Sequence, residues 1–427
     1  MLDNLLHLNH VSIKHKYIIL FPKSNKVMSI SNRLINYYKI IFFIALLLRV
    51  AFHFYSPISY FPDSTSYIHL SKIIFSGVYF EDNQAMPGYP IFLFLSDKIF
   101  SNYFILDILV SSFLVLIAGK LYYKIFKDEL GAKICVLFFA IYPFNILYAS
   151  LLLSENSYIF FNIIGFTFLY SNRNILGSLF IIISILIRPT LDLLNIIIIM
   201  SVSYFVFKDH YKITIKKIII FIGLYCVILS PWWIYNYERF GQFVKLTPGF
   251  GLVIYSGNNE LNKTGGGNYR EDFNFDIVAG EKDPLKKNKI MRDAAINFII
   301  ENPIRFTKLS IKRFIRFFNV VPNYKSSDII DGKYTHKLIF YASAITMLCL
   351  YLFSLLGLIS LKKDKFIKLL PLFIYFILVT GIHIVTISSI RYRFPIEFIL
   401  LILSSFYIST ILNKIDKKNI FKFKFLK

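Results

Sequence analysis

Residues 56 to 90 read SPISYFPDSTSYIHLSKIIFSGVYFEDNQAMPGYP. This stretch is the first long polar interruption in a chain of apolar runs. Its first acidic residue, Asp63, directly follows a proline and precedes an amphipathic run. Apolar runs flank the stretch on both sides, and runs of about 18 residues or more predict bilayer-spanning helices. We therefore predict a loop over residues 56 to 102 between two spans, with a short helix over residues 64 to 76.

The apolar runs predict an all-α polytopic membrane protein. Of the 427 residues, 56% are hydrophobic, which is more apolar surface than a soluble chain of this length can bury. The runs do not alternate in polarity as the strands of a membrane β-barrel would. We count about ten spans: Tyr38–Phe54, Tyr103–Tyr123, Ile134–Ala149, Leu151–Tyr170, Ile175–Ile187, Leu193–Phe207, Ile218–Tyr235, Leu338–Leu361, Leu369–Ile387 and Pro395–Leu412.

Charge sets the expected orientation. The formal net charge is +23, and lysines gather in short clusters between apolar runs. In the ten-span count every lysine cluster falls on one side, which the positive-inside rule identifies as cytoplasmic. We therefore expect a multi-pass protein of the inner (plasma) membrane with both termini in the cytoplasm. The clusters do not indicate nucleic-acid binding.

The same count divides the chain into segments. Two long stretches, residues 56–102 and 236–336, fall outside the cell. Met28 resembles a typical start for such a protein. We therefore expect translation to begin at Met28, with residues 1 to 27 added by an over-extended gene prediction. The predicted segments are a cytoplasmic N-terminus (1–37), a transmembrane bundle (38–235), an extracytoplasmic loop domain (236–336), C-terminal transmembrane helices (337–412) and a basic cytoplasmic tail (413–427).

Two further patterns have structural interpretations. The three cysteines, Cys135, Cys226 and Cys349, lie inside apolar runs and are expected to be core residues rather than disulfide or metal ligands. Residues 302 to 318 interleave Arg and Lys with Phe and Ile. This pattern predicts a helix lying in the membrane interface, with its cations directed towards lipid headgroups.

Two carboxylates are candidates for chemistry. Asp63 is either the N-terminal cap of the predicted short helix or a general base at the membrane surface, and the two roles are compatible because a helix N-terminus favours the ionised form. Glu155 falls near the outer end of the fourth span, where a carboxylate is costly. It is either a catalytic group or the structural partner of an arginine.

Three arginines lie on the side that the positive-inside rule predicts to be poor in cations. Arg188, Arg391 and Arg393 fall at the outer ends of the fifth and ninth spans. Guanidinium groups suit phosphate oxygens, so we predict a phosphate-binding role. The alternatives are contact with lipid headgroups or a pair with Glu155. A local pair between Arg188 and Asp192, four residues on, is also open.

Several ordered stretches resemble a known family. They are PDSTSYIHLSKIIFSGVYF, MPGYPIFLFLSDKIF, YPFNILYASLLLSENSYIFF, ILIRPT, PWWIYNYERFGQFVKLTPGFGLVIYSGNN and RYRFPIEF, within residues 38 to 412. Together they resemble bacterial membrane glycosyltransferases of the GT-C fold, in the broad group similar to glycosyltransferase family 39. That group includes the protein O-mannosyltransferases and the lipid A aminoarabinose transferase.

The resemblance implies a reaction. Such enzymes move a sugar from a polyprenyl-phosphate carrier to a lipid, glycan or protein acceptor outside the cytoplasm, usually with inversion. The family's first-loop aspartate corresponds to Asp63 and deprotonates the acceptor. Arg188, Arg391 or Arg393 would then hold the carrier phosphate. The resemblance fixes no cofactor, leaves a divalent metal open, and assigns no metal ligand.

The chain departs from the family at one position. The named members have Asp-Glu in the first loop, whereas here Ser64 follows Asp63. A second acid is therefore sought among Glu81, Asp82 and Glu155. Residues of the two outer loops that we expect near substrate are Tyr67, Tyr89, Asn258 and Asn259. Two other functions stay open: an O-antigen polymerase or ligase, and a flippase or transporter of lipid-linked sugars.

Overall fold

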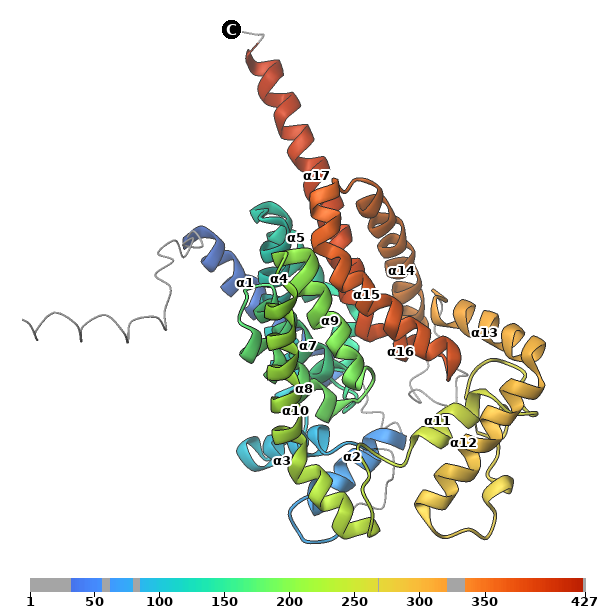
Figure 1. The fold of residues 1–427 in the computed structure, drawn as a ribbon. Helices are drawn as coiled ribbons and strands as arrows, with labels where there is room; N and C mark the ends of the chain where they lie inside the picture. The colour runs from blue at the N-terminus through green and yellow to red at the C-terminus, as the bar shows by residue number, and fades with distance from the viewer. Residues whose placement is uncertain (1–31, 56–61, 80–84, 268, 321–334, 425–427) are drawn as a thin grey trace, which may run out of the picture.

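A computed structural model describes residues 32–55, 62–79, 85–267, 269–320 and 335–424. Met28, Glu81 and Asp82 lie outside these ranges. Within them the chain is helical and contains no strand, as the apolar runs predict. Figure 1 shows a helical bundle with smaller helices gathered at one end.

The helices follow one another with short connections. In chain order they are α1 (Asn32–Tyr55), α2 (Pro62–Ile73), α3 (Gly88–Phe100), α4 (Ile105–Phe126), α5 (Glu129–Ile141), α6 (Pro143–Tyr148), α7 (Glu155–Leu169), α8 (Asn174–Ile187), η1 (Asp192–Leu194), α9 (Asn195–Ser201), the π-helical turn η2 (Val202–Phe207), α10 (Tyr211–Phe240), α11 (Phe250–Gly257), η3 (Asp276–Val278), α12 (Pro284–Glu301), α13 (Pro303–Phe317), α14 (Thr335–Ile359), α15 (Lys363–Val385), α16 (Ile390–Arg393), η4 (Phe394–Ile396) and α17 (Glu397–Lys424).

Each of the ten predicted spans corresponds to helical structure, but not each to one long helix. The third is divided at Pro143 into α5 and α6, because proline cannot donate the backbone hydrogen bond that a helix interior needs. The sixth is made of the short pieces η1, α9 and η2. Among the described residues, six helices are long and apolar enough to cross a membrane. The count of ten spans stays a prediction.

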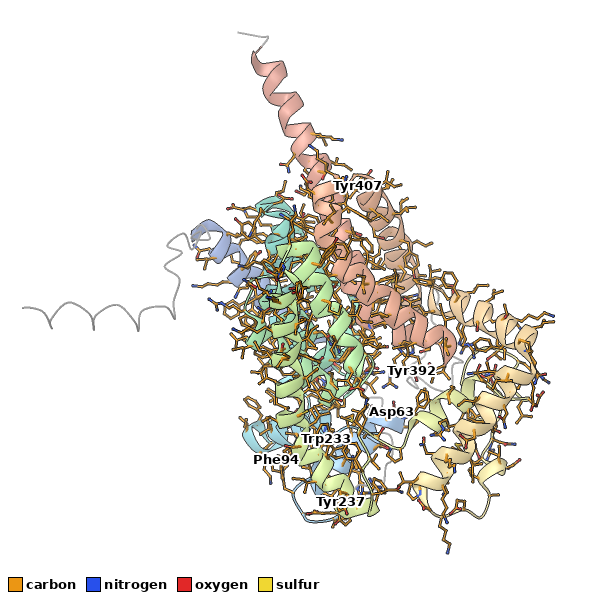
Figure 2. The ribbon with its side chains drawn as sticks, in the orientation of Figure 1. Asp63, Phe94, Trp233, Tyr237, Tyr392 and Tyr407 are labelled. Carbon is orange, nitrogen blue, oxygen red and sulfur yellow. The ribbon has the colours of Figure 1, made fainter. Side chains whose placement is uncertain are left out.

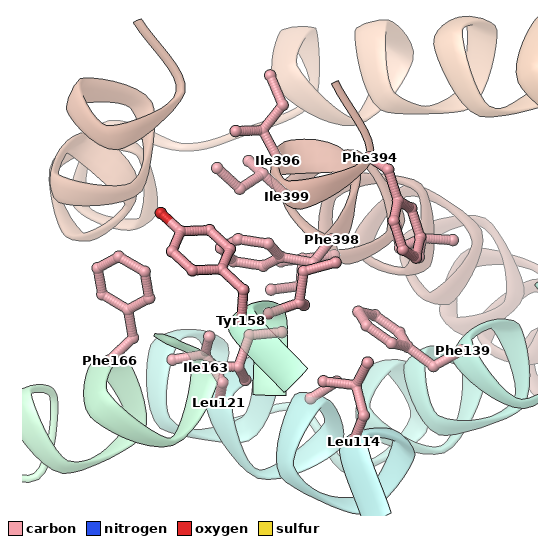
Figure 3. Packing of buried hydrophobic residues seen from close by; sticks show 14 of the residues in the cluster. Leu114, Leu121, Phe139, Tyr158, Ile163, Phe166, Phe394, Ile396, Phe398 and Ile399 are labelled. Atoms are coloured by element: carbon pink, nitrogen blue, oxygen red, sulfur yellow. The ribbon is translucent and has the colours of Figure 1, made fainter. Parts of the chain in front are cut away.

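The core lies where α4, α5, α7 and α17 meet. Figure 3 shows Phe394 and Phe398, from η4 and α17, facing side chains of α4, α5 and α7 such as Phe139 and Tyr158. Two glycines allow α7 and α8 to approach closely. A Cβ on Gly165 would lie 2.7 Å from a side-chain carbon of α8, and a Cβ on Gly177 would lie 2.6 Å from a leucine of α7. Small residues at helix contacts are typical of membrane bundles.

The two ends of the bundle differ. Helices α2, α3, α11 and α12 lie at one end, whereas the α14–α15 connection and the C-terminal end of α17 lie at the other (Figure 1). The predicted outer segments therefore share one end, which we call the loop end. The side chains of Asp63, Trp233 and Tyr237 are seen towards this end in Figure 2.

One of the three cysteines is a core residue, as the sequence predicts, and the other two are exposed. Cys135 is buried in α5, as expected for a core residue. Cys226 and Cys349 are exposed on α10 and α14, so the prediction that they are core residues is wrong for these two. Both helices are candidate spans with outward apolar faces, and a small thiol suits such a face as well as a protein core.

Candidate active site

Helix α2 brings Asp63 to the surface of the loop end. Pro62 begins the helix, a position that proline favours because its missing N–H has no partner there, and Asp63 follows in the first turn. The opposite side of the helix is anchored, since the Ser64 hydroxyl donates to the Leu151 carbonyl at 2.7 Å. The Asp63 side chain remains 52% exposed. The helix begins two residues before the predicted start and ends at Ile73, so Asp63 lies inside its first turn rather than at the cap, and its carboxylate is accessible.

Four charged side chains form a chain of alternating sign at this end. Arg391 Nη1 donates to Asp63 Oδ2 at 2.6 Å. The Nε of the same guanidinium donates to Glu155 Oε1. Arg188 Nη1 donates to that same oxygen at 2.5 Å. The order is Asp63, Arg391, Glu155, Arg188, and we call these residues the charge chain.

Glu155 is the centre of the charge chain. It is the first residue of α7 and is fully buried, whereas both arginine side chains keep a small exposed fraction. A carboxylate buried without a counter-ion is strongly unfavourable, and two guanidiniums supply the opposite charge here. Glu155 therefore pairs with two arginines, both through the same carboxylate oxygen. The catalytic role considered for Glu155 stays a prediction.

Arg393 lies outside the charge chain. Although only two residues from Arg391, it is fully buried and donates from Nε to Glu397 Oε1 at 2.7 Å. Its Nη1 also donates to the carbonyls of Phe317 and Asn319. Positions i and i+2 of a helix point in different directions, whereas i and i+4 are neighbours. The structure therefore ties Arg393 to the core, whereas the side chains of Arg188 and Arg391 keep exposures of 16% and 17%. The predicted phosphate-binding role is not tested by these contacts.

The segment before Arg391 is held by α13. Arg313 is fully buried and donates from Nη1 to the Gly257 carbonyl at 2.7 Å and to the Thr386 carbonyl at 3.1 Å. The Ser388 hydroxyl donates to the Arg313 carbonyl at 2.8 Å, and Arg316 Nε donates to the Ser388 carbonyl at 3.1 Å. The prediction that the cations of this helix face headgroups is wrong for Arg313, which shares its buried face with leucine and phenylalanine four residues to either side.

Gly257→Ala tests how strictly this segment is placed. A Cβ at Gly257 would lie 1.7 Å from the Thr386 carbonyl oxygen, so the backbone before Arg391 must shift. We expect a stability loss of about 1–3 kcal/mol, measured by thermal unfolding in detergent, together with weaker transfer activity. Gly223→Ala in α10 is the control, because nothing lies within 4 Å of its Cβ position. Equal behaviour of the two variants would contradict the proposed constraint.

The two tyrosines of the first loop have different surroundings. Tyr67 in α2 places its hydroxyl 3.4 Å from Ser154 Oγ, and Ser154 also accepts from Arg188. Its ring meets that of Tyr89 edge-on, with centroids 4.8 Å apart. Tyr89 is fully buried and donates to Asp107 Oδ2 at 2.6 Å. Tyr67 thus borders the charge chain, whereas Tyr89 supports it from within the bundle.

Asn258 and Asn259 build a loop. Asn258 Nδ2 donates to the carbonyls of Ile254 and Val385 at 2.9 Å each, and its Oδ1 accepts from Arg313. Asn259 Nδ2 donates to the Tyr255 carbonyl at 2.7 Å. Both side chains are buried. These amide contacts give the two residues a structural role and leave them apart from the charge chain.

Sequence reasoning missed two residues beside the charge chain. The Arg188 guanidinium lies over the Tyr392 ring, 5.9 Å from its centroid. The His383 ring stacks on the Tyr392 ring, with centroids 4.8 Å apart. The Arg-Tyr-Arg spacing was the only available signal for Tyr392. The local pair considered for Arg188 and Asp192 does not form, because Asp192 pairs with Lys245.

The surroundings of Asp63 favour its ionised form. Burial of the carboxylate would raise the pKa of Asp63, but the charge and hydrogen bond of Arg391, with a smaller contribution from Arg188, outweigh it and hold that pKa below its ordinary value. Asp63 is therefore a carboxylate at neutral pH. A group in this state accepts protons and donates none.

The pH profile of activity follows from this shift. If catalysis needs ionised Asp63, activity is present above its lowered pKa and falls only as the pH drops through that value. Arg391→Met removes the main lowering influence, so the acidic limb of kcat/KM should move to higher pH, whereas Arg391→Lys should move it less. Because the lowered pKa places the limb of the unaltered protein below about pH 4, the profile is measured from about pH 2.5 to about pH 8. Identical acidic limbs in all three proteins would contradict the role of the pair.

No group of three or more His, Cys, Asp or Glu side chains that could hold a metal ion is found in the part of the chain that the structure describes. The two carboxylates of the charge chain are joined by a guanidinium.

Comparison with known proteins identifies the fold. Among solved structures, the chain is similar to the archaeal oligosaccharyltransferase AglB from Archaeoglobus fulgidus, in complex with an inhibitory peptide and a dolichol-phosphate, with a TM-score of 0.51 and 11% sequence identity. The similarity covers 92% of this chain and 52% of that chain, so this protein spans about half the length of its structural neighbour. No protein-family model matches the sequence, and no curated protein matches it. The predicted GT-C fold is confirmed.

Proposed function

We propose that this protein is a membrane glycosyltransferase that moves a sugar from a polyprenyl-phosphate-linked donor to a hydroxyl-bearing acceptor outside the cytoplasm. The observation that carries the proposal is the charge chain at the loop end of a GT-C bundle. It combines an accessible carboxylate with two guanidiniums, which are the groups that proton abstraction and phosphate binding require.

Asp63 is the proposed general base. Of the two carboxylates in the charge chain, Asp63 is half exposed and Glu155 is fully buried. A base must come within hydrogen-bond reach of the hydroxyl that it deprotonates, and only Asp63 meets this condition without rearrangement of the bundle. Glu155 is thereby assigned a positioning role, since it holds both arginines at one oxygen.

Arg391 and Arg188 are the proposed phosphate ligands. Their guanidiniums meet at Glu155 and retain side-chain exposures of 17% and 16%. Guanidinium groups offer several donors in one plane, which suits the oxygens of a phosphate. The dolichol-phosphate bound by the structural neighbour is a lipid phosphate of the same chemical class, which supports this choice of donor.

Inversion is the expected stereochemistry, because the charge chain holds one accessible carboxylate, Asp63. Retention in one active site needs a nucleophile that forms a sugar intermediate in addition to an acid or base. Buried Glu155 is not placed for attack on a sugar. A single displacement with Asp63 as base inverts the anomeric centre. The anomeric configuration of the product, measured by NMR, tests this point.

A transporter is less consistent with the placement of charge. Transporters of the kind considered place their charged binding groups near the middle of the membrane. Asp63 instead lies in the first turn of α2, and Glu155 is the first residue of α7. Arg188 follows the end of α8, and Arg391 lies in α16, shortly before α17. These are helix ends, and a site at the membrane surface suits transfer to an acceptor from outside.

The test is incubation of purified protein with a panel of polyprenyl-phosphate sugars and candidate acceptors, followed by mass spectrometry for released polyprenyl phosphate. Each donor is assayed with added divalent metal and with chelator. We expect carrier release from one donor class together with a sugar-bearing acceptor. Movement of an intact donor across vesicles without carrier release would contradict the proposal. So would a topology map placing Asp63 in the cytoplasm.

A further inference from the structure

Arg391 makes two ion pairs that differ in strength, one with Glu155 and one with Asp63. Nε contacts Glu155, which is fully buried and shared with Arg188, whereas Nη1 contacts Asp63, which is 52% exposed. An ion pair with an exposed member contributes little to stability, whereas separating a buried pair is strongly unfavourable. The Glu155 contact is therefore a fixed anchor, and the Asp63 contact is the one that exchanges readily.

The charge chain has no surplus charge while Asp63 is ionised. Two carboxylates face two guanidiniums, so the formal sum is zero. A leaving lipid phosphate becomes more negative as its bond to the sugar breaks, and it needs positive charge at that moment. Protonation of Asp63 removes one negative charge and leaves the chain with a formal charge of +1. The charge chain thus becomes positive when Asp63 has accepted the proton of the acceptor.

We propose that Arg391 is a shared donor, whose Nη1 holds Asp63 in the resting enzyme and turns to the leaving phosphate as Asp63 takes the acceptor's proton. This inference rests on the proposed function. The acceptor O–H proton passes to Asp63, and the acceptor oxygen bonds to the anomeric carbon. The bond between that carbon and the phosphate oxygen breaks, its electron pair stays on that oxygen, and the phosphate charge changes from −1 to −2.

The surroundings of Asp63 couple its basicity to the position of the Arg391 guanidinium. Besides Arg391, the charged and titratable groups that act on it within the described chain are Arg188, Tyr67 and Tyr392. While Nη1 stays on Asp63, the carboxylate is a weak base, because the guanidinium stabilises its charge. Once Nη1 turns to phosphate, Asp63 loses that stabilisation and its basicity rises. Phosphate binding and proton abstraction therefore assist each other.

Asp63→Asn separates this proposal from a fixed pair. The amide has the shape of the carboxyl group without its charge, so Arg391 is held only by a neutral acceptor and the chain carries a formal charge of +1. We expect the variant to bind a short-chain polyprenyl phosphate about tenfold more tightly than the unaltered protein, although it transfers no sugar. Asp63→Ala, which also removes the acceptor of Nη1, should bind more tightly as well. Binding is measured by calorimetry in detergent, with the matching polyprenol as the blank.

Two controls identify the source of the gain. Asp293→Asn removes the exposed carboxylate of an Asp–Arg pair in α12 and should leave the affinity unchanged. Adding Arg391→Met to Asp63→Asn should abolish the gain. If both Asp63 variants bind with the affinity of the unaltered protein, or less tightly, the shared-donor proposal is wrong and the proposed function stands. If the unaltered protein does not distinguish polyprenyl phosphate from polyprenol, the proposed function itself is wrong.

Discussion

Asp63→Asn should lower sugar transfer by about 10²–10⁴-fold, which is the usual contribution of a general base. The asparagine amide keeps the size of the side chain but does not take a proton from the acceptor hydroxyl. Because Asp63 lies in the first turn of α2 and is half exposed, the substitution should leave folding nearly unchanged. The rate is measured as polyprenyl phosphate released from the donor that the panel identifies.

Two comparisons make this result specific. Asp63→Glu restores a carboxylate one methylene further from the helix and should recover part of the rate, whereas Asp293→Asn should retain all of it. Thermal unfolding of each variant shows whether a lost rate reflects a lost fold. Full transfer activity of Asp63→Asn in well-folded protein would remove Asp63 from the mechanism.

Glu155→Gln should have the largest effect on stability. Glu155 Oε1 accepts from both Arg188 and Arg391, and the whole side chain is buried. Glutamine keeps the shape but removes the only negative charge between two partly buried guanidiniums. Breaking a buried ion pair by removing one partner costs about 3–5 kcal/mol. We expect a lower thermal midpoint and strongly reduced transfer, because Arg391 then loses its anchor.

Glu260→Gln is the matched control. Glu260 pairs with Arg305 on the surface, and its side chain is 67% exposed, so its loss should be small. A Glu155→Gln protein as stable and as active as the Glu260→Gln protein would show that the two guanidiniums do not depend on the buried carboxylate. A stable but inactive Glu155→Gln protein would instead support the positioning role.

Some of the site was readable from the residues alone. The proline before Asp63 and the amphipathic run after it predict a helix with an acidic first turn, and α2 begins at Pro62. The cost of Glu155 near a span end predicts an arginine partner. The burial of Arg313 was also readable, because it falls four residues from both Leu309 and Phe317 and so shares their face. The other Arg and Lys residues of the same stretch, which alternate with Phe and Ile, made Arg313 look like one more interfacial cation.

Other assignments needed the fold. Asp63 and Arg391 are 328 residues apart, and no periodicity links residues so distant. Arg391 and Arg393 have the same chemistry and nearly the same position in the sequence, yet one reaches the loop end and the other the core. The i, i+4 spacing of Arg393 and Glu397 was a local sign of this division. Asn258 and Asn259 show the same limit, because amides suit a substrate and a backbone carbonyl equally well.

The sequence by itself determined that this is a helical membrane protein, and it placed the candidate site residues at or near the ends of the apolar runs. That conclusion is local, since apolar length, proline positions and lysine clusters act through the nearest turns of chain and through the bilayer. Only the tertiary structure decided which charges meet. Burial makes each unpaired charge too costly to persist, so the packing of α2, α7, α8 and α16 selects Asp63, Arg391, Glu155 and Arg188 as one connected chain.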